Sequence, residues 1–175
     1  YIKNVNTGNT LGDKDSKSGR ATIVFTPTET IKNTLVVQYA DVKGTEGTGN
    51  LYNYYAVTDP RGIAPTGWHV PDLNDWETLF QFINSSDQAA SKLKAISNLW
   101  FSGSCASNTY SFSALPGGYR DYSGNDLYLG QYANFWSSSN SSGAGYMVSM
   151  YYYNCYVDKM YAIYRNGYSV RCVKD

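Results

Sequence analysis

The chain has 175 residues and a mass of 19.5 kDa, and its 14 Lys and Arg balance its 14 Asp and Glu. This size suits a single domain, and the balanced charge argues against nucleic-acid binding and against intrinsic disorder. Charged residues make up only 16% of the chain, below the usual ~25%, whereas 18 residues are tyrosine. We therefore expect a globular protein that stays in solution through hydroxyl and amide groups, a composition typical of secreted and cell-surface proteins.

The N-terminal part of the chain contains two β-rich stretches, residues 21–26 and 34–40, which we expect to form strands. Composition changes near residue 50, and two strands alone do not make a stable domain. We therefore divide the chain into residues 1–50 and residues 51–175. The first part is a short β segment or the remnant of a preceding β domain.

Two helices are expected after residue 51. Apolar residues recur at helical spacing from Leu73 to Asn84, and Asp72 is a good N-cap because its carboxylate can accept an early backbone N–H. A second, shorter helix is expected from Gln88 to Ile96, with Ala89, Leu93 and Ile96 facing inward. No apolar run in the chain approaches the ~18–20 residues of a membrane-spanning helix.

Strand patterns dominate the C-terminal third. We expect strands at 134–139, 146–153, 155–161 and 168–173, separated by Ser-, Gly- and Asn-containing turns. Helices followed by a run of antiparallel strands predict an α+β fold.

Three cysteines, Cys105, Cys155 and Cys172, leave at least one thiol unpaired within the chain. One disulfide is possible, and Cys105 with Cys172 is the pair that we favour. With scattered cysteines and a single histidine, His69, a zinc site is not expected, and we predict no metal and no cofactor. At the entry to the first helix, His69 is expected to be structural rather than catalytic.

The carboxylates offer no clear catalytic pair. Asp121 and Asp126 lie in one loop and could bind a cation, but turn formation by Asx chemistry explains them better.

The strongest candidate for a binding site is the tyrosine-rich C-terminal stretch. Consecutive strand residues point to opposite faces, so Tyr151, Tyr152 and Tyr153 cannot all be buried on one side. Tyrosine combines a large contact area with a hydrogen-bonding tip, which is the chemistry of binding surfaces. The candidate ligand-binding residues are Tyr146, Ser149, Tyr151, Tyr152, Tyr153, Asn154, Tyr156, Asp158, Tyr161, Tyr164, Arg165, Asn166, Trp136 and Ser138. The competing explanation is that these tyrosines stabilise the sheet through cross-strand pairing.

Several ordered motifs carry a resemblance to a known family. They include residues 52–57, 59–62, 64–71, 115–120, 136–139 and 167–173. Together they resemble the Fibrobacter succinogenes major paralogous domain, which occurs in secreted proteins and surface lipoproteins of Bacteroidetes and Fibrobacteres. The resemblance implies a layout similar to the C-type lectin-like fold, in which two helices precede long loops and a curled sheet whose last strand returns beside the first.

Three functional readings follow from the resemblance. Calcium-dependent sugar binding is not implied, because the lectin calcium motifs are missing and Trp136 is followed by three serines. The fold is also found in formylglycine-generating enzymes, which use a pair of active-site cysteines. For this chain to be such an oxidase, Cys155 and Cys172 would have to be neighbours. The fold is shared as well with the variable proteins of diversity-generating retroelements, in which adenine-directed mutation converts Asn codons into codons for Tyr, Ser and Asp. Such residue types are frequent at positions 149–166. Four residues in or next to this stretch are not products of this codon change and would have to be constant: Met147, Met150, Lys159 and Met160.

We therefore predict a non-catalytic, exported ligand-binding module of a bacterial cell-surface protein, with a role such as adhesion. Its ligand would be a glycan or a protein, not nucleic acid, and its location extracellular or on the outer cell surface. The alternative is a structural, fimbrial or cell-envelope subunit without a ligand of its own.

Overall fold

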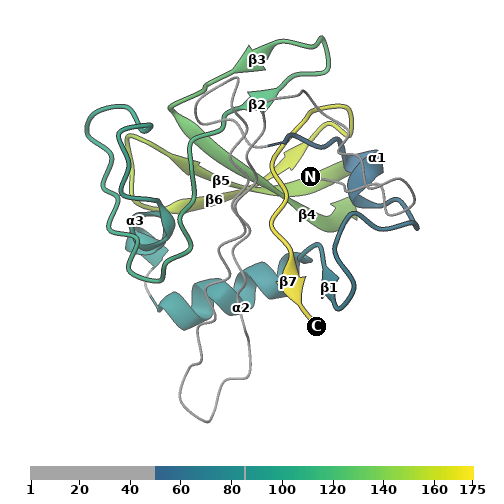
Figure 1. Cartoon of the computed structure of the whole chain (residues 1–175), viewed down its shortest axis with the longest axis horizontal. Helices are drawn as coiled ribbons and strands as arrows, with labels where there is room; N and C mark the ends of the chain where they lie inside the picture. Colours follow the sequence, from purple (N-terminus) through teal and green to yellow (C-terminus); the bar gives the residue numbers. More distant parts are fainter. Residues whose placement is uncertain (1–49, 85) are drawn as a thin grey trace, which may run out of the picture.

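Three antiparallel strands form the central sheet, in the order β4 (Tyr132–Ser141), β5 (Ala144–Tyr151) and β6 (Val157–Ala162) (Figure 1). They are seen in a computed structural model that describes residues 50–84 and 86–175. The strands expected at 21–26 and 34–40 lie outside these residues. The three expected strands of the C-terminal sheet are confirmed, with β4 longer than the sequence pattern predicted.

Two smaller antiparallel pairs complete the β structure. β1 (Trp68–His69) pairs with β7 (Val173–Lys174), and β2 (Tyr119–Arg120) pairs with β3 (Asp126–Leu127). The expected final strand at 168–173 is mostly irregular. Tyr168 and Ser169 form only single bridges, to Tyr52 and to Phe135. With its helices and antiparallel sheets, the described part of the chain has an α+β fold.

Helix α2 (Leu73–Ile83) confirms the first predicted helix. Asp72 caps it: the Asp72 carboxylate accepts from the backbone N–H of Asp75, and the Asp75 carboxylate accepts from the Asp72 N–H. This capping box satisfies two backbone donors that the first turn leaves unpaired. The helix ends at Asn84, which adopts a left-handed conformation.

The second predicted helix is shorter than expected. A 3₁₀ turn, η1 (Ser86–Gln88), leads into α3 (Ala89–Leu93), which stops at the extended residue Lys94. Ala89 and Leu93 are buried as predicted, but Ile96 is 75% exposed, so its predicted inward position is wrong. The helix ends early because the backbone from Lys94 turns to run beside Ala114.

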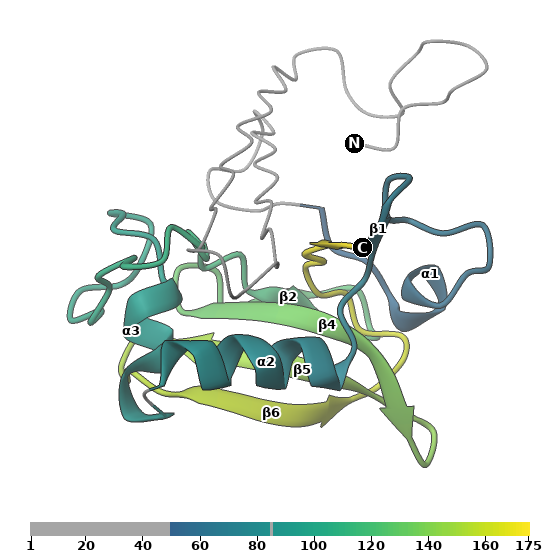
Figure 2. The ribbon, with the colours of Figure 1, turned by 90° about the horizontal axis from the view of Figure 1, so that it is seen from below.

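Two hydrophobic clusters cover opposite faces of the central sheet. On one face, α2 and α3 pack against Phe135, Val148 and Met150, as the side view in Figure 2 shows for α2. On the other face, α1 (Tyr54–Val57) and Tyr168 pack against Trp136. Neighbouring strand residues point to opposite faces, so Phe135 and Trp136 enter different clusters.

Trp136 anchors the second cluster. It is fully buried, and its indole N–H donates to the Tyr52 carbonyl at 2.6 Å. Its ring meets the rings of Tyr54 and Tyr168 edge-on, with centroids 5.2 and 4.7 Å away. One side chain thus joins β4 to the first described residues and to the C-terminal segment.

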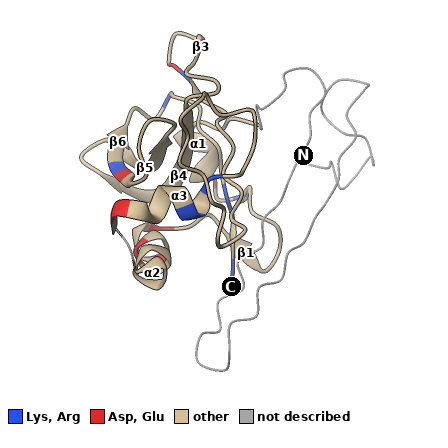
Figure 3. Cartoon of the chain, turned by 90° about the vertical axis from the view of Figure 1, so that its left-hand side faces the viewer, with Lys and Arg blue, Asp and Glu red and all other residues tan. Residues whose placement is uncertain are grey.

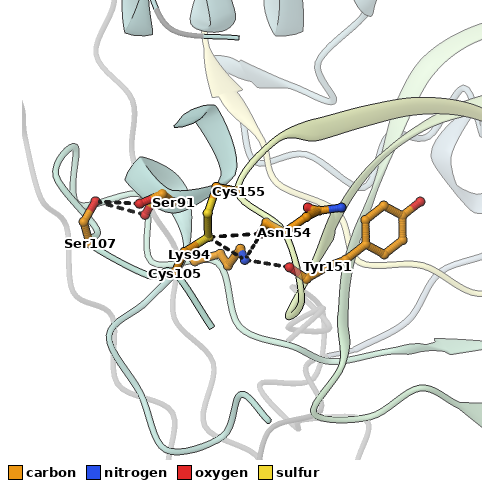
Figure 4. Close-up of a disulfide and its surroundings, with 7 residues drawn as sticks. All are labelled: Ser91, Lys94, Cys105, Ser107, Tyr151, Asn154 and Cys155. Atoms are coloured by element: carbon orange, nitrogen blue, oxygen red, sulfur yellow. Dashed lines mark hydrogen bonds between the residues drawn. A yellow bond between two sulfur atoms is a disulfide. The ribbon is translucent and has the colours of Figure 1, made fainter. Parts of the chain in front are cut away.

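The disulfide differs from the favoured pairing. Cys105 is bonded to Cys155 (Figure 4). Cys172 is a free thiol. The first residues of α3 explain why, because the N–H groups of Ala90 and Ser91 donate to the Cys155 carbonyl at 2.8 and 3.3 Å. These bonds bring the β5–β6 turn to the segment that follows α3, where Cys105 lies. Because Cys155 is bonded to Cys105, it is not paired with Cys172 as the formylglycine-generating hypothesis required.

Replacing Trp136 with Ala tests the importance of this anchor. We expect the free energy of unfolding to fall by about 3–5 kcal/mol, as for other buried aromatic truncations, because a cavity opens and the Tyr52 carbonyl loses its donor. Urea denaturation measures the change. Tyr122→Ala, at a tyrosine that is 63% exposed, is the control and should change stability by less than about 0.5 kcal/mol. Equal losses in both variants would contradict the assignment of Trp136 as an anchor.

Candidate functional site

Three consecutive tyrosines lie where β5 ends: Tyr151 is its last residue, and Tyr152 and Tyr153 lie in the turn that follows. Tyr151 and Tyr153 lie on one side with their rings stacked, 5.4 Å between centroids and 15° between planes. Tyr152 packs against the helix-covered core, and its ring also meets the Tyr153 ring edge-on at 5.3 Å. Tyr151 is 8% exposed and Tyr153 is 58% exposed, so Tyr153 offers most of its surface to a ligand.

Three further tyrosines extend this side into a continuous array. Tyr132 on β4 is the register partner of Tyr151, and their rings meet edge-on at 4.8 Å. Tyr128 stacks on Tyr132 at 4.4 Å and 9°, and Tyr119 stacks on Tyr128 at 5.8 Å. We call these five residues, Tyr119, Tyr128, Tyr132, Tyr151 and Tyr153, the tyrosine surface.

Glycines let the supporting loops approach closely enough to form this array. Gly118 precedes Tyr119 with φ +62°, and a Cβ there would lie 2.2 Å from the Leu127 carbonyl oxygen. Gly130, between Tyr128 and Tyr132, lies under the Phe101 ring, which an added Cβ would meet at 2.7 Å. At Gly118 an added Cβ would overlap the backbone, and both glycines have positive φ, +62° and +79°, which other residues rarely adopt.

A polar layer supports the rings from within the sheet. The Ser149 hydroxyl donates to the Asn134 side-chain carbonyl, and the Tyr151 hydroxyl donates to the Met160 sulfur at 3.1 Å. Burial raises the pKa of Tyr151 to about 12, and the nearby Asp158 carboxylate acts in the same direction. Burial also raises the pKa of Tyr119 and of Tyr132. These three phenols therefore stay neutral at physiological pH and act as hydrogen-bonding groups, not as bases.

Several predicted ligand-binding residues lie in the interior. Trp136 and Ser149 are at most 1% exposed, and Asn166 is buried with its amide donating to the Tyr168 hydroxyl at 3.0 Å. These three residues cannot contact a ligand in this structure and are excluded from the tyrosine surface. Ser138 is half-buried, and its carbonyl accepts from the Tyr54 hydroxyl.

The remaining predicted residues are spread over other parts of the molecule. Tyr146 and Tyr161 face each other across β5 and β6 with their hydroxyls hydrogen-bonded, on the side of the sheet that carries Lys159. Tyr164 stacks on Tyr54 beside α1. The other residues of this group are Asn154, half-buried in the β5–β6 turn, and the exposed Tyr156 and Arg165. The structure thus brings together Tyr151, Tyr153, the adjacent Tyr152, and Asp158.

Sequence reasoning missed Tyr119, Tyr128 and Tyr132. A signal was present, because the segment from 117 to 132 carries four tyrosines, at 119, 122, 128 and 132. Their convergence with Tyr151 depends on the β4–β5 register, which residue spacing does not reveal.

His69 links the start of α2 to the C-terminal Asp175. Its Nδ1 lies 2.7 Å from an Asp175 carboxylate oxygen, and its Nε2 lies 3.1 Å from an Asp75 carboxylate oxygen. Both ring nitrogens are thus engaged where β1 meets β7 and α2, which supports the structural role. The hydrogen bond to Asp175, and then that to Asp75, raise the pKa of His69, while partial burial opposes them.

Carboxylates and metal-binding side chains form no further centre in the described residues. No group of three or more His, Cys, Asp or Glu that could hold a metal ion occurs there. Asp121 accepts from the N–H groups of Ser123 and Asn125, both at 2.9 Å, so it forms the predicted Asx turn.

The raised His69 pKa predicts a pH-dependent stability. Protonated His69 is favoured in the folded protein, so its stabilising contribution is complete below the unfolded pKa of about 6.5 and is lost as pH rises through the higher folded value. Urea midpoints measured from pH 5.5 to 9 should fall more steeply in the wild type than in His69→Gln. Parallel curves for the two proteins would contradict this.

Of three comparisons with known proteins, the one with family models agrees with the sequence motifs. No curated protein and no solved structure matches this chain. In the described residues, no helix is long and apolar enough to cross a bilayer. One family model, described as the Fibrobacter succinogenes major domain, matches residues 4–174, from within the N-terminal segment to the end of β7. The chain therefore belongs to the Fibrobacter succinogenes major domain family.

Proposed function

We propose that this chain is a non-catalytic, exported ligand-binding module of a bacterial cell-surface protein, with a C-type lectin-like fold, which recognises a glycan or a protein. The observation that carries this proposal is the tyrosine surface, where five rings from three separate segments form one array. A sheet stabilised by tyrosine pairing alone would not need its outermost rings to be open. Tyr128 is 42% exposed and Tyr153 is 58% exposed.

The chemistry of the array favours an uncharged ligand. Exposed ring faces pack against apolar surfaces such as the C–H faces of sugars, and phenolic hydroxyls hydrogen-bond at their edge. Tyrosine has two side-chain torsions, so it is ordered on binding at low entropic cost. Figure 3 shows charged residues on short stretches of the ribbon, including part of β6, and two carboxylates act on rings of the array, Asp158 on Tyr151 and Asp121 on Tyr119. Because contacts to phenol rings involve no ion pair, binding should depend only weakly on salt concentration.

The disulfide supports export. Disulfides persist in oxidising compartments outside the cytoplasm, and the Cys105–Cys155 bond links two segments 50 residues apart in the sequence. Attachment to the cell surface as a lipoprotein, as in other members of this family, is part of the same proposal.

An assembly role remains the second candidate because β6 is at the edge of the central sheet. An edge strand presents unpaired backbone groups that can pair with another chain. Sedimentation analysis distinguishes the two: concentration-dependent oligomers that Val157→Pro or Lys159→Pro dissolves would favour a structural subunit, whereas a monomer favours the binding module.

Sequence diversification of the site is tested at the level of codons. Codons for residues 145–166 should be sequenced across a natural population of the source organism. Variation restricted to adenine-derived positions in this window would support a diversified receptor. An invariant window would overturn diversification and leave a binder of constant specificity.

Removing the two most exposed rings tests the binding surface. Tyr128→Ser with Tyr153→Ser should weaken binding by tenfold or more. The double variant should remain folded with a lowered thermal unfolding midpoint, because each ring loses stacking contacts worth about 0.5–1.5 kcal/mol. Binding is measured on arrays of glycans and of surface proteins. Tyr122→Ser with Tyr161→Ser is the matched control, since both tyrosines are exposed but lie outside the tyrosine surface. Equal loss in the two double variants would contradict the site, and a wild-type protein that binds nothing on either array would contradict the function.

A further inference from the structure

A lysine is fully buried beside the disulfide. Lys94 follows α3, and its ammonium donates to the carbonyls of Tyr151 and Asn154 at 2.6 and 2.7 Å (Figure 4). The same nitrogen lies 3.6 Å from the sulfur of Cys105. An ammonium has three donors, so the two carbonyls leave one for the sulfur.

The charge of Lys94 has no acidic partner in the described part of the chain, whose ion pairs all involve other residues. The Trp100 ring, 5.2 Å away, is its other electrostatic contact. Burial lowers the pKa of Lys94 to about 8, so most molecules still carry the ammonium at neutral pH. A buried cation without a counter-ion is costly, and it would be relieved by a negative charge on the adjacent sulfur.

We propose that the Cys105–Cys155 disulfide is a thiol–disulfide exchange site for a dithiol reductant, in which Lys94 makes Cys105 the leaving thiolate. Cys105 and Cys155 are both half-buried residues rather than fully buried ones, and the exchange requires the attacking thiolate to reach the Cys155 sulfur. The site is independent of what the tyrosine surface binds.

The reaction balances in two steps. The reductant thiolate attacks the Cys155 sulfur, a mixed disulfide forms, and the Cys105 sulfur leaves as a thiolate paired with the Lys94 ammonium. The second thiol of the reductant, as its thiolate, then attacks the mixed disulfide and closes its own disulfide, releasing Cys155 as a thiolate that takes a proton from water. The protein is reduced by two electrons and the dithiol is oxidised by two. Attack occurs faster on the sulfur whose partner is the better-stabilised leaving group.

The free thiol provides an internal comparison. Cys172 is half-buried next to Arg171, and burial raises its pKa. Reduced Cys105 beside an ammonium should therefore react with an alkylating reagent much faster than Cys172 at neutral pH.

The first experiment uses the unmodified protein. Glutathione is added to the oxidised chain, the reaction is quenched at early times with an alkylating reagent, and the peptides are mapped by mass spectrometry. We expect glutathione on Cys155 and the alkyl group on Cys105, in at least tenfold excess over the reverse pattern. Equal amounts of both patterns, or glutathione mainly on Cys105, would overturn the proposal.

A second experiment removes the charge. In a Cys155→Ser, Cys172→Ser background, the rate of Cys105 alkylation is followed against pH. Its midpoint should lie below about 8.5, the value of an ordinary thiol. Lys94→Met should move the midpoint upward, whereas Lys92→Met, which removes a cation two residues away in the sequence, should not. An unmoved midpoint in folded Lys94→Met would overturn the proposal, and if that variant does not fold, the peptide mapping alone decides.

Discussion

The alternation of side chains along β4 is the constraint on which the rest of the structure depends. Phe135 enters the cluster beneath α2 and α3, and the next residue, Trp136, enters the cluster beneath α1. A strand buried on both faces cannot shift its pairing by one residue without exchanging the contents of two cores. This locks the β4–β5 register, and with it the opposition of Tyr132 and Tyr151 on which the tyrosine surface is built.

Local signals in the sequence predicted the elements that local chemistry determines. Asp72 followed by an apolar stripe predicted α2 and its cap, because both depend on residues within one or two helical turns. The end of α3 was not predictable in this way, since Lys94 leaves the helix to donate to carbonyls of residues more than 50 positions away. The predicted disulfide partner of Cys105 was wrong for the same reason, because the actual pairing depends on a contact between α3 and the β5–β6 turn.

The same difference between local and long-range contacts explains which parts of the candidate site were predicted. Alternation predicted that Tyr151, Tyr152 and Tyr153 could not all be buried on one side, and Tyr153 is indeed 58% exposed whereas Tyr151 is 8% exposed. Residue type alone could not tell that Trp136 and Ser149 face the interior, because both kinds of side chain also serve on binding surfaces. Nor could it join Tyr119 and Tyr128 to the array, since two glycine-dependent close approaches bring their loops there.

The three-segment origin of the tyrosine surface has a consequence for any repertoire built on this scaffold. Changes restricted to residues 145–166 reach Tyr151 and Tyr153 but leave Tyr119, Tyr128 and Tyr132 as they are. Every variant would then present the same three rings, Tyr119, Tyr128 and Tyr132, beside two positions that vary. Such a repertoire would sample ligands that share one common feature, held by the constant rings, and differ in what lies next to it.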